Sequence, residues 1–244
     1  MRQPLVWQVI TKAASGELTN EMYSQWVHRP HYYSSHPKHM HFFHNPILEA
    51  GSKTSWYIIP LFWTPVILAM VYYFGLGLTT ATAVSYFGAG VVYWTLLEYV
   101  LHRFVFHMDT WVPNHPAGII AHFVLHGCHH KVPNDRYRLV FPPAAAILLA
   151  LPVFSISRAL LYVFIPDAQL FGMFMTGVIL GYMCYDLIHY GTHHGNWSRT
   201  SFMGRIRSYH LAHHYATSFD KGFGISSTFW DHVFGTVLYK QQAE

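Results

Sequence analysis

Histidines are concentrated in four short boxes of this sequence. The boxes read EYVLHRFVFH, HFVLHGCHH, YDLIHYGTHH and YHLAHH. Imidazole nitrogens are good ligands for zinc, copper, iron and nickel, so repeated histidines at short spacing indicate metal chemistry. The candidate metal ligands are His102, His107, His126, His129, His130, His189, His193, His210, His213 and His214.

The spacing within the boxes predicts helices that present these side chains together. Residues three and four apart share a helix face, so His126, His129 and His130 are expected to point one way. The same holds for the three candidates of the fourth box, and for His189 with His193. One catalytic zinc takes three protein ligands and a water, so this many imidazoles exceed the needs of one ion. Two metals with about five ligands each would use all of them.

The first box does not fit this spacing. His102 and His107 are five residues apart, which is about 140° around a straight α-helix. Both cannot face one ion on such a helix. Either the helix breaks, or the two residues serve different metals.

Four further residues are expected to support the ligands. Metal-bound histidines usually donate their second ring N–H to a carboxylate or a carbonyl. Glu98 and Asp186 lie one helical turn before His102 and His189 and fit that role. His122 lies four residues before His126 and His194 directly follows His193, so either could be a ligand or a hydrogen-bond partner of a ligand.

Other residues near the boxes are interpreted as non-ligands. The N-terminal stretch HRPHYYSSHPKHMHFFH holds six histidines at irregular spacing, and we expect it to be a surface segment near the lipid headgroups. His115 and His232 are isolated. Cys128 lies inside a box but points away from its histidines on a helix, so we expect it to pack in the interior.

Long apolar runs predict the elements that position the boxes. The stretch 54–97 contains no Asp, Glu, Lys or Arg, and a membrane helix needs about 20 apolar residues. We predict spans at 56–74, 79–97, 144–165 and 169–185. The fold class is therefore all-α: an integral membrane protein with four transmembrane helices in two hairpins. A soluble protein with two buried hairpins is the alternative.

The topology of two hairpins places every histidine on one side of the membrane. Residues 1–53, an N-terminal segment, share that side with residues 98–138 and 186–244, which form a histidine-rich helical cap over those ends of the spans. This side carries the Lys and Arg residues that flank the spans, which predicts a cytosolic location. The formal charge of +4 suits anionic headgroups. We expect membrane lipid as a partner and no nucleic acid.

Several stretches resemble the fatty acid 2-hydroxylases, which belong to the fatty acid hydroxylase superfamily. They include HGCHHKVPNDRYRLVFPP and KGFGISSTFWDHVFGT in addition to the four boxes. The resemblance implies a di-iron monooxygenase of the endoplasmic reticulum membrane that uses O₂ as co-substrate. It would hydroxylate carbon 2 of long or very long acyl chains, commonly the N-acyl chain of ceramide or dihydroceramide. It also implies the ten ligands named above, with zinc able to replace iron in isolated protein.

The resemblance carries one departure. Many fungal and animal relatives have an N-terminal haem domain, whereas about 53 residues precede the first predicted span here, as in the shorter plant relatives. We therefore expect a separate membrane b-type cytochrome to donate the electrons.

Three other readings of the boxes remain open. The first is another membrane di-iron oxygenase, namely a sterol oxidase, a desaturase or a carotenoid hydroxylase. The second is a non-catalytic metal-binding membrane protein, although a transporter would need ionisable residues through its spans. The third is a dizinc hydrolase, which would need a carboxylate base and an open water site.

Overall fold

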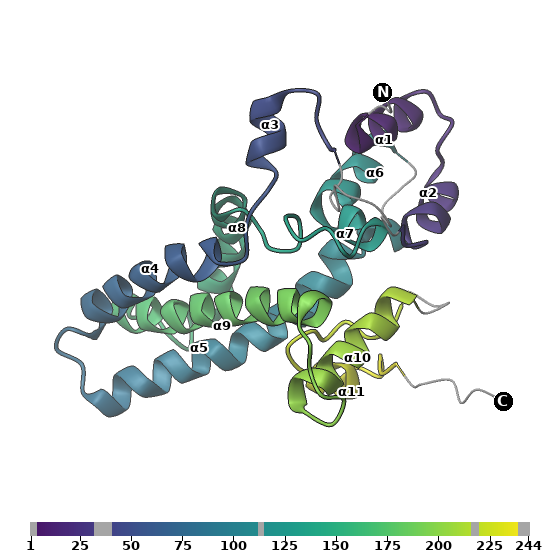
Figure 1. The fold of residues 1–244 in the computed structure, drawn as a ribbon. Helices are drawn as coiled ribbons and strands as arrows, with labels where there is room; N and C mark the ends of the chain where they lie inside the picture. The colour runs from purple at the N-terminus through teal and green to yellow at the C-terminus, as the bar shows by residue number, and fades with distance from the viewer. Residues whose placement is uncertain (1–3, 32–40, 112–114, 216–219, 239–244) are drawn as a thin grey trace.

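The computed structural model describes residues 4–31, 41–111, 115–215 and 220–238, and every regular element in these ranges is helical. Four helical segments are long and apolar enough to cross a membrane. They contain α4 (Ile58–Gly75), α5 (Thr80–Val100), α8 (Pro143–Leu161) and α9 (Ala168–His194). Helices α4, α5 and α9 extend away from the shorter helices of the cap (Figure 1). The predicted all-α class and the four spans are confirmed.

Two of the helices run past the span ends that we predict. The second helical segment runs over Thr80–Phe106 and the fourth over Ala168–His194, each 27 residues long, although we predicted ends at 97 and 185. Such a helix is about 40 Å long, while the hydrocarbon core is about 30 Å thick. Both helices therefore continue beyond the apolar run and carry the first and third histidine boxes on rigid extensions.

Short turns close the two hairpins. Gly77 has a φ of 76° between α4 and α5, a left-handed conformation that favours glycine. Thr79 then caps α5 by accepting a hydrogen bond from the backbone N–H of Thr82 at 3.2 Å. Between α8 and α9, Arg158 donates to the carbonyl oxygens of Ile165 and Pro166 at 2.7 and 2.8 Å. Backbone carbonyls thus solvate the charge of Arg158, and α8 ends at Leu161 rather than at 165.

Helix α9 lies at the centre of the spans. In its most apolar window 61% of residues are buried, against 11–22% in the other three segments. Glycines allow α5 and α9 to touch: a Cβ on Gly90 would lie 1.9 Å from the carbonyl oxygen of Phe174, and one on Gly177 would lie 1.9 Å from that of Phe87. Close approach through small residues is a common way for membrane helices to pack without a hydrophobic driving force.

The cap consists of short helices at one end of α5 and α9. A π-helical turn, η1 (Leu101–Phe106), continues α5 and is followed by η2 (Met108–Thr110). Helix α6 (Pro116–His122), a second π-helical turn η3 (Phe123–Gly127) and α7 (Cys128–Lys131) carry the second box. Helices α10 (Phe202–Tyr215) and α11 (Phe229–Val233) complete the cap.

The N-terminal segment packs against the cap through an apolar cluster. Helices α1 (Leu5–Ala14) and α2 (Asn20–Val27) bury Val6, Val9, Tyr23 and Val27 against Ile119 of α6 and Phe123 of η3. Cys128 packs against the same cluster, as expected.

A charged network fastens α3 (Pro46–Gly51) to the chain after the second box. Glu49 accepts hydrogen bonds from Arg138 and from the backbone N–H groups of Phe42 and Phe43 at 2.8–3.0 Å, and lies 2.7 Å from Lys53 Nζ. Burial alone would raise the pKa of Glu49, but Lys53, the two N–H groups and Arg138 outweigh it and lower the pKa to about 2. The side chain of Arg138 is 5% exposed, so it serves the fold.

Candidate metal centre

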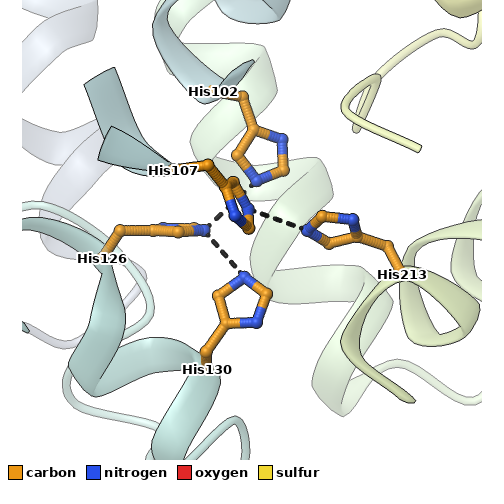
Figure 2. A group of neighbouring side chains, drawn as sticks. All are labelled: His102, His107, His126, His130 and His213. Atoms are coloured by element: carbon orange, nitrogen blue, oxygen red, sulfur yellow. Dashed lines mark hydrogen bonds between the residues drawn. The ribbon is translucent and has the colours of Figure 1, made fainter. Parts of the chain in front are cut away.

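The ten candidate ligands form two adjacent groups. The first consists of His102, His107, His126, His130 and His213, and the second of His129, His189, His193, His210 and His214. Within each group, one ring nitrogen per residue lies within 4.8 Å of all the others. Figure 2 shows rings of the first group pointing toward one another from separate helices.

The nitrogen contacts in the first group link three of its members in a row and the other two in a pair. The Nε2 atom of His126 lies 3.2 Å from that of His102 and 3.1 Å from that of His130. The Nε2 atoms of His107 and His213 are 3.1 Å apart.

The second group repeats this pattern. The Nε2 atom of His210 lies 2.9 Å from that of His193 and 3.0 Å from that of His214. The Nε2 atoms of His189 and His129 are 3.0 Å apart. The ring centroids of His130 and His214 are 4.4 Å apart, so the two groups adjoin.

Each of the two H-x-x-H-H sequences divides its histidines between the groups. His126 and His130 belong to the first group, while His129 belongs to the second. This differs from the single direction that we expected. Positions i and i+4 differ by about 40° around a helix, whereas adjacent residues differ by about 100°. Adjacent histidines can therefore face two neighbouring centres.

The π-helical turn η1 explains how the first box reaches one centre. The backbone N–H of His107, which follows this turn, donates to the carbonyl oxygen of His102 at 3.1 Å. This is the i to i+5 pairing of a π-helix. This pairing places residues five apart roughly above one another. The predicted conflict between His102 and His107 is thus relieved by widening the helix locally, and both side chains lie in the first group.

Burial keeps these imidazoles neutral. All ten are at most 7% exposed. Burial, and next the neighbouring His130, lower the pKa of His126, while burial lowers the pKa of His213 to about 4. Each neutral ring has one nitrogen lone pair available as a ligand.

The donor set fits one metal ion in each group. A neutral ring carries one proton, yet His126 Nε2 and His210 Nε2 each face two other Nε2 atoms. A cation that accepts the lone pairs satisfies this arrangement better than hydrogen bonds among them. Imidazole nitrogens bind zinc at about 2.1 Å, so two on opposite sides of an ion are about 4.2 Å apart, which agrees with the limit of 4.8 Å. An all-imidazole set suits iron, zinc, copper or nickel.

Backbone carbonyls orient two of the rings. The Nδ1 atom of His102 lies 2.5 Å from the carbonyl oxygen of Phe223, and that of His213 lies 2.8 Å from that of Lys221. Both carbonyls belong to the segment between α10 and α11. Such a bond fixes which nitrogen carries the proton and leaves Nε2 free to bind.

Glu98 contacts this segment rather than His102. Its carboxylate accepts hydrogen bonds from the backbone N–H groups of Ile225 and Ser226 at 2.8 and 2.7 Å, and a short one from the Ser226 hydroxyl. Asp186 accepts from the hydroxyl of Tyr182 at 3.1 Å. Glu98 thus holds the segment whose Phe223 carbonyl orients His102, and Asp186 pairs with Tyr182 one turn earlier on α9. The role of both carboxylates beside the metal ligands stays a prediction.

A buried polar cluster that the sequence did not predict lies against the first group. His28 is 3% exposed, which corrects our expectation that the N-terminal histidines form a surface segment. Its Nε2 lies 3.0 Å from Asp109, whose other oxygen lies 3.0 Å from His122 Nε2. Although burial would raise the pKa of Asp109, contacts with His122 and His28 hold it well below its usual range. His28 lacks the regular spacing of the boxes, so no pattern marked it.

The remaining histidines lie outside both groups. His122 contacts Tyr23 through Nδ1 at 2.6 Å and Asp109 through Nε2, so both of its nitrogens have partners other than the ten. The ring of His194 lies against that of Tyr190, with centroids 4.9 Å apart and planes tilted by 35°. The other members named as non-ligands that the structure describes are exposed: His31, His41, His44, His115 and His232. His36 and His39 lie outside the described residues.

An apolar cavity of about 300 Å³ lies among the spans. No histidine lines it, but its lining includes Phe106 and Tyr185. The ring of Phe106 stacks on His126 of the first group at a centroid distance of 5.1 Å, and that of Tyr185 stacks on His189 of the second at 5.9 Å. One aromatic ring of the lining thus lies between the cavity and a histidine of each group.

Comparisons with known proteins agree with this architecture. The sequence model of the family described as fatty acid hydroxylase matches residues 87–236. The ceramide very long chain fatty acid hydroxylase scs7 of Schizosaccharomyces pombe is 38% identical, over 100% of this chain and 67% of its own length. The dihydroceramide fatty acyl 2-hydroxylase FAH1 of Arabidopsis thaliana is 39% identical, over 97% of this chain and 92% of its own.

A solved structure shows the same fold. It is described as full-length scs7p with only the hydroxylase domain visible, and it matches with a TM-score of 0.86 and 37% identity. The match covers 97% of this chain and 84% of that one. The chain therefore belongs to the fatty acid hydroxylase family and is an enzyme, an oxidoreductase of the monooxygenase class.

Proposed function

We propose that this enzyme hydroxylates carbon 2 of long or very long acyl chains, and that its substrate is the N-acyl chain of ceramide or dihydroceramide. The observation that carries this proposal is the apolar cavity among the spans, whose lining includes Phe106 and Tyr185, the rings that stack on one histidine of each group. A long apolar chain can enter such a cavity from the bilayer. The names of the Schizosaccharomyces pombe and Arabidopsis thaliana relatives support the substrate class.

We propose that the two groups hold two iron ions, one each. When bound, such a pair activates O₂ for the oxidation of an unactivated C–H bond, which side chains alone do not achieve. His102, His107, His126, His130 and His213 would hold one ion, and His129, His189, His193, His210 and His214 the other. Zinc in isolated protein would fit the same nitrogens.

The residues of the chain contribute binding, orientation and exclusion of water. The cavity walls remove the acyl chain from water, and the rings of Phe106 and Tyr185 lie where the reacting end of the chain would approach the histidines. The carbonyl groups of Phe223 and Lys221 keep protons on the outer nitrogens of His102 and His213. The balanced reaction consumes the acyl C–H, O₂, two electrons and two protons, and forms the alcohol and water.

A separate membrane b-type cytochrome is the electron donor in this proposal, and the cap faces the cytosol at the endoplasmic reticulum membrane. The charge distribution supports this orientation. The connections at 76–79 and 162–167 contain no Lys or Arg, whereas residues such as Arg199, Arg205 and Lys221 lie at the other end of the spans. Positive residues favour the cytosolic side of membrane proteins.

Mass spectrometry of sphingolipids tests the proposal. The chain is expressed in yeast that lacks its own ceramide hydroxylase, next to His126→Ala and, as a control, His232→Ala. His232 is exposed and lies outside both groups. We expect ceramides with a 2-hydroxy acyl chain from the wild type and from His232→Ala, and none from His126→Ala.

Two outcomes would contradict the proposal. Hydroxylated product from His126→Ala at the wild-type level would remove the histidine groups from the reaction. Wild-type protein that is present in membranes and supplied with a b-type cytochrome, yet yields no 2-hydroxy acyl chains, would overturn the substrate or the position of hydroxylation.

A further inference from the structure

We infer that His28 of the N-terminal segment is a positioning residue for His130 of the first group, and that Asp109 fixes His28 for this task. The inference rests on the proposed metal centre. It also extends the site beyond residues 87–236, the part of the chain that matches the family model.

A continuous line of buried contacts joins the three residues. His28 Nε2 lies 3.0 Å from Asp109 Oδ2, and the two side chains are each 1% exposed. On the other edge of the ring, His28 Nδ1 lies 3.4 Å from His130 Nδ1, at the long end of the hydrogen-bond range. The ring of His28 also stacks on His107, with centroids 5.6 Å apart and planes 6° apart. His28 thus contacts two members of the first group.

The chemistry of the three groups gives this line a direction. A carboxylate accepts hydrogen bonds, so Asp109 favours a proton on Nε2 of His28. The Nδ1 atom of His28 then presents a lone pair, which accepts from Nδ1–H of His130. His130 consequently keeps its Nε2 lone pair for the centre, where that atom lies 3.1 Å from His126 Nε2. In many metal sites a carboxylate accepts a hydrogen bond directly from a metal-bound histidine and so orients it. Here the imidazole of His28 lies between the carboxylate of Asp109 and His130.

The chain that carries His28 is tied directly to the second box. Lys131, the residue after His130, donates from Nζ to the carbonyl oxygens of Trp26 and Arg29 at 2.8 Å. The backbone N–H of His31 donates to the carbonyl oxygen of Lys131 at 2.7 Å. Residues on both sides of His28 are therefore held against the residue that follows His130, which sets the approach of the two rings.

His122 offers a matched control. It contacts Asp109 at the same distance of 3.0 Å as His28 does, and it is equally buried. Its second nitrogen faces the hydroxyl of Tyr23 rather than one of the ten histidines. Replacing either histidine therefore removes one partner of Asp109, but only replacement of His28 removes the contact with His130.

The test measures metal retention in purified protein loaded with two equivalents of Fe(II) and then exposed to a chelator under anaerobic conditions. The variants are His28→Phe, which keeps the ring, His28→Asn, whose amide oxygen replaces Nδ1 as an acceptor, and His122→Phe. His107→Ala removes one nitrogen of the first group, so the ion whose release it accelerates is the ion of that group. We expect His28→Phe to release that ion about 10 to 100 times faster than the wild type, with the other ion released at the wild-type rate. His28→Asn should release it more slowly than His28→Phe, and His122→Phe at nearly the wild-type rate.

Equal release from His28→Phe and the wild type would overturn the role of His28 and leave the metal centre intact. Faster release of both ions from His28→Phe and His122→Phe alike would show that only packing is affected, and would also overturn it. Wild-type protein that retained no ion would instead overturn the proposed metal centre itself. His28→Asn keeps the test valid where His28→Phe fails to fold.

Discussion

His129 and His130 are neighbours in the chain and belong to different histidine groups. The Nε2 atom of His129 lies 3.0 Å from that of His189, while that of His130 lies 3.1 Å from that of His126. His213 and His214 are divided in the same way. Each H-x-x-H-H sequence thus links the two groups, which fixes the distance between them through short helices.

Replacing these two neighbours separately should affect different ions. We predict that His129→Ala weakens binding in the second group and His130→Ala in the first, because each removes one of five nitrogens. Both variants should lose more than about 100-fold in hydroxylation, since each group is needed. Metal analysis together with the spectra of Co(II)-loaded protein measures the effect. Identical loss of the same ion from both variants would contradict the assignment of the groups.

Helix contact in the membrane gives a second prediction. Gly90→Ala should destabilise the protein by about 1–3 kcal/mol or more, because a Cβ there would lie 1.9 Å from the carbonyl oxygen of Phe174. Gly88→Ala is the control, since nothing lies within 4 Å of its Cβ position. It should be neutral or stabilise by up to about 1 kcal/mol. Thermal unfolding in detergent compares them; a similar Tm for both variants would argue against close contact of α5 and α9.

The apolar cavity gives a third prediction. Ala146 lines the cavity, whereas Ala144, on the same helix α8, is exposed and lies outside its lining. Ala146→Phe should reduce hydroxylation of the longest acyl chains several-fold and shift the products toward shorter chains, while the metal content stays unchanged. Ala144→Phe should leave the product distribution as it is. Chain-length analysis of the 2-hydroxy products decides this, and an unchanged distribution in Ala146→Phe would place the acyl chain elsewhere.

Much of this architecture follows from residue types and spacing. The charge-free run at 54–97 and the later apolar block predict four membrane helices, and the boxes mark ten histidines that the structure brings together. The ends of the membrane helices are harder to predict, because α5 and α9 continue as helices after the apolar residues stop. Hydropathy reports the solvent around a helix and not the point at which its hydrogen bonds end.

Contacts between distant parts of the chain were beyond the sequence. His28 and Asp109 are 81 residues apart, and neither belongs to a periodic pattern. The division of His129 from His130 also depends on where two other helices place their side chains. The π-helical turn at His102 to His107 has a sequence signal, namely a spacing of five where four was expected. That spacing shows that His102 and His107 cannot face one ion on a straight α-helix. It does not show that a π-helical turn brings them together.

The network around Glu49 gives a prediction for pH. The pKa of Glu49 is lowered from 4.5 to about 2 in the folded protein. Its ionised form therefore stabilises the fold above about pH 4.5, and this contribution is lost as the pH falls toward 2. Glu49→Gln should cost about 1–3 kcal/mol near neutral pH, and its Tm should approach that of the wild type in acid. A gap in Tm that widens on acidification would contradict this account.

Oxygen incorporation into the product tests the central claim most directly. Purified enzyme loaded with Fe(II) is supplied with a ceramide substrate, a b-type cytochrome with its reductase, and ¹⁸O₂. Fragmentation by mass spectrometry then locates the label. The proposed function predicts one ¹⁸O atom at carbon 2 of the N-acyl chain, and none with His129→Ala or His130→Ala. Product oxygen that comes from water, a label at another carbon, or labelling at the wild-type level by either variant would contradict it.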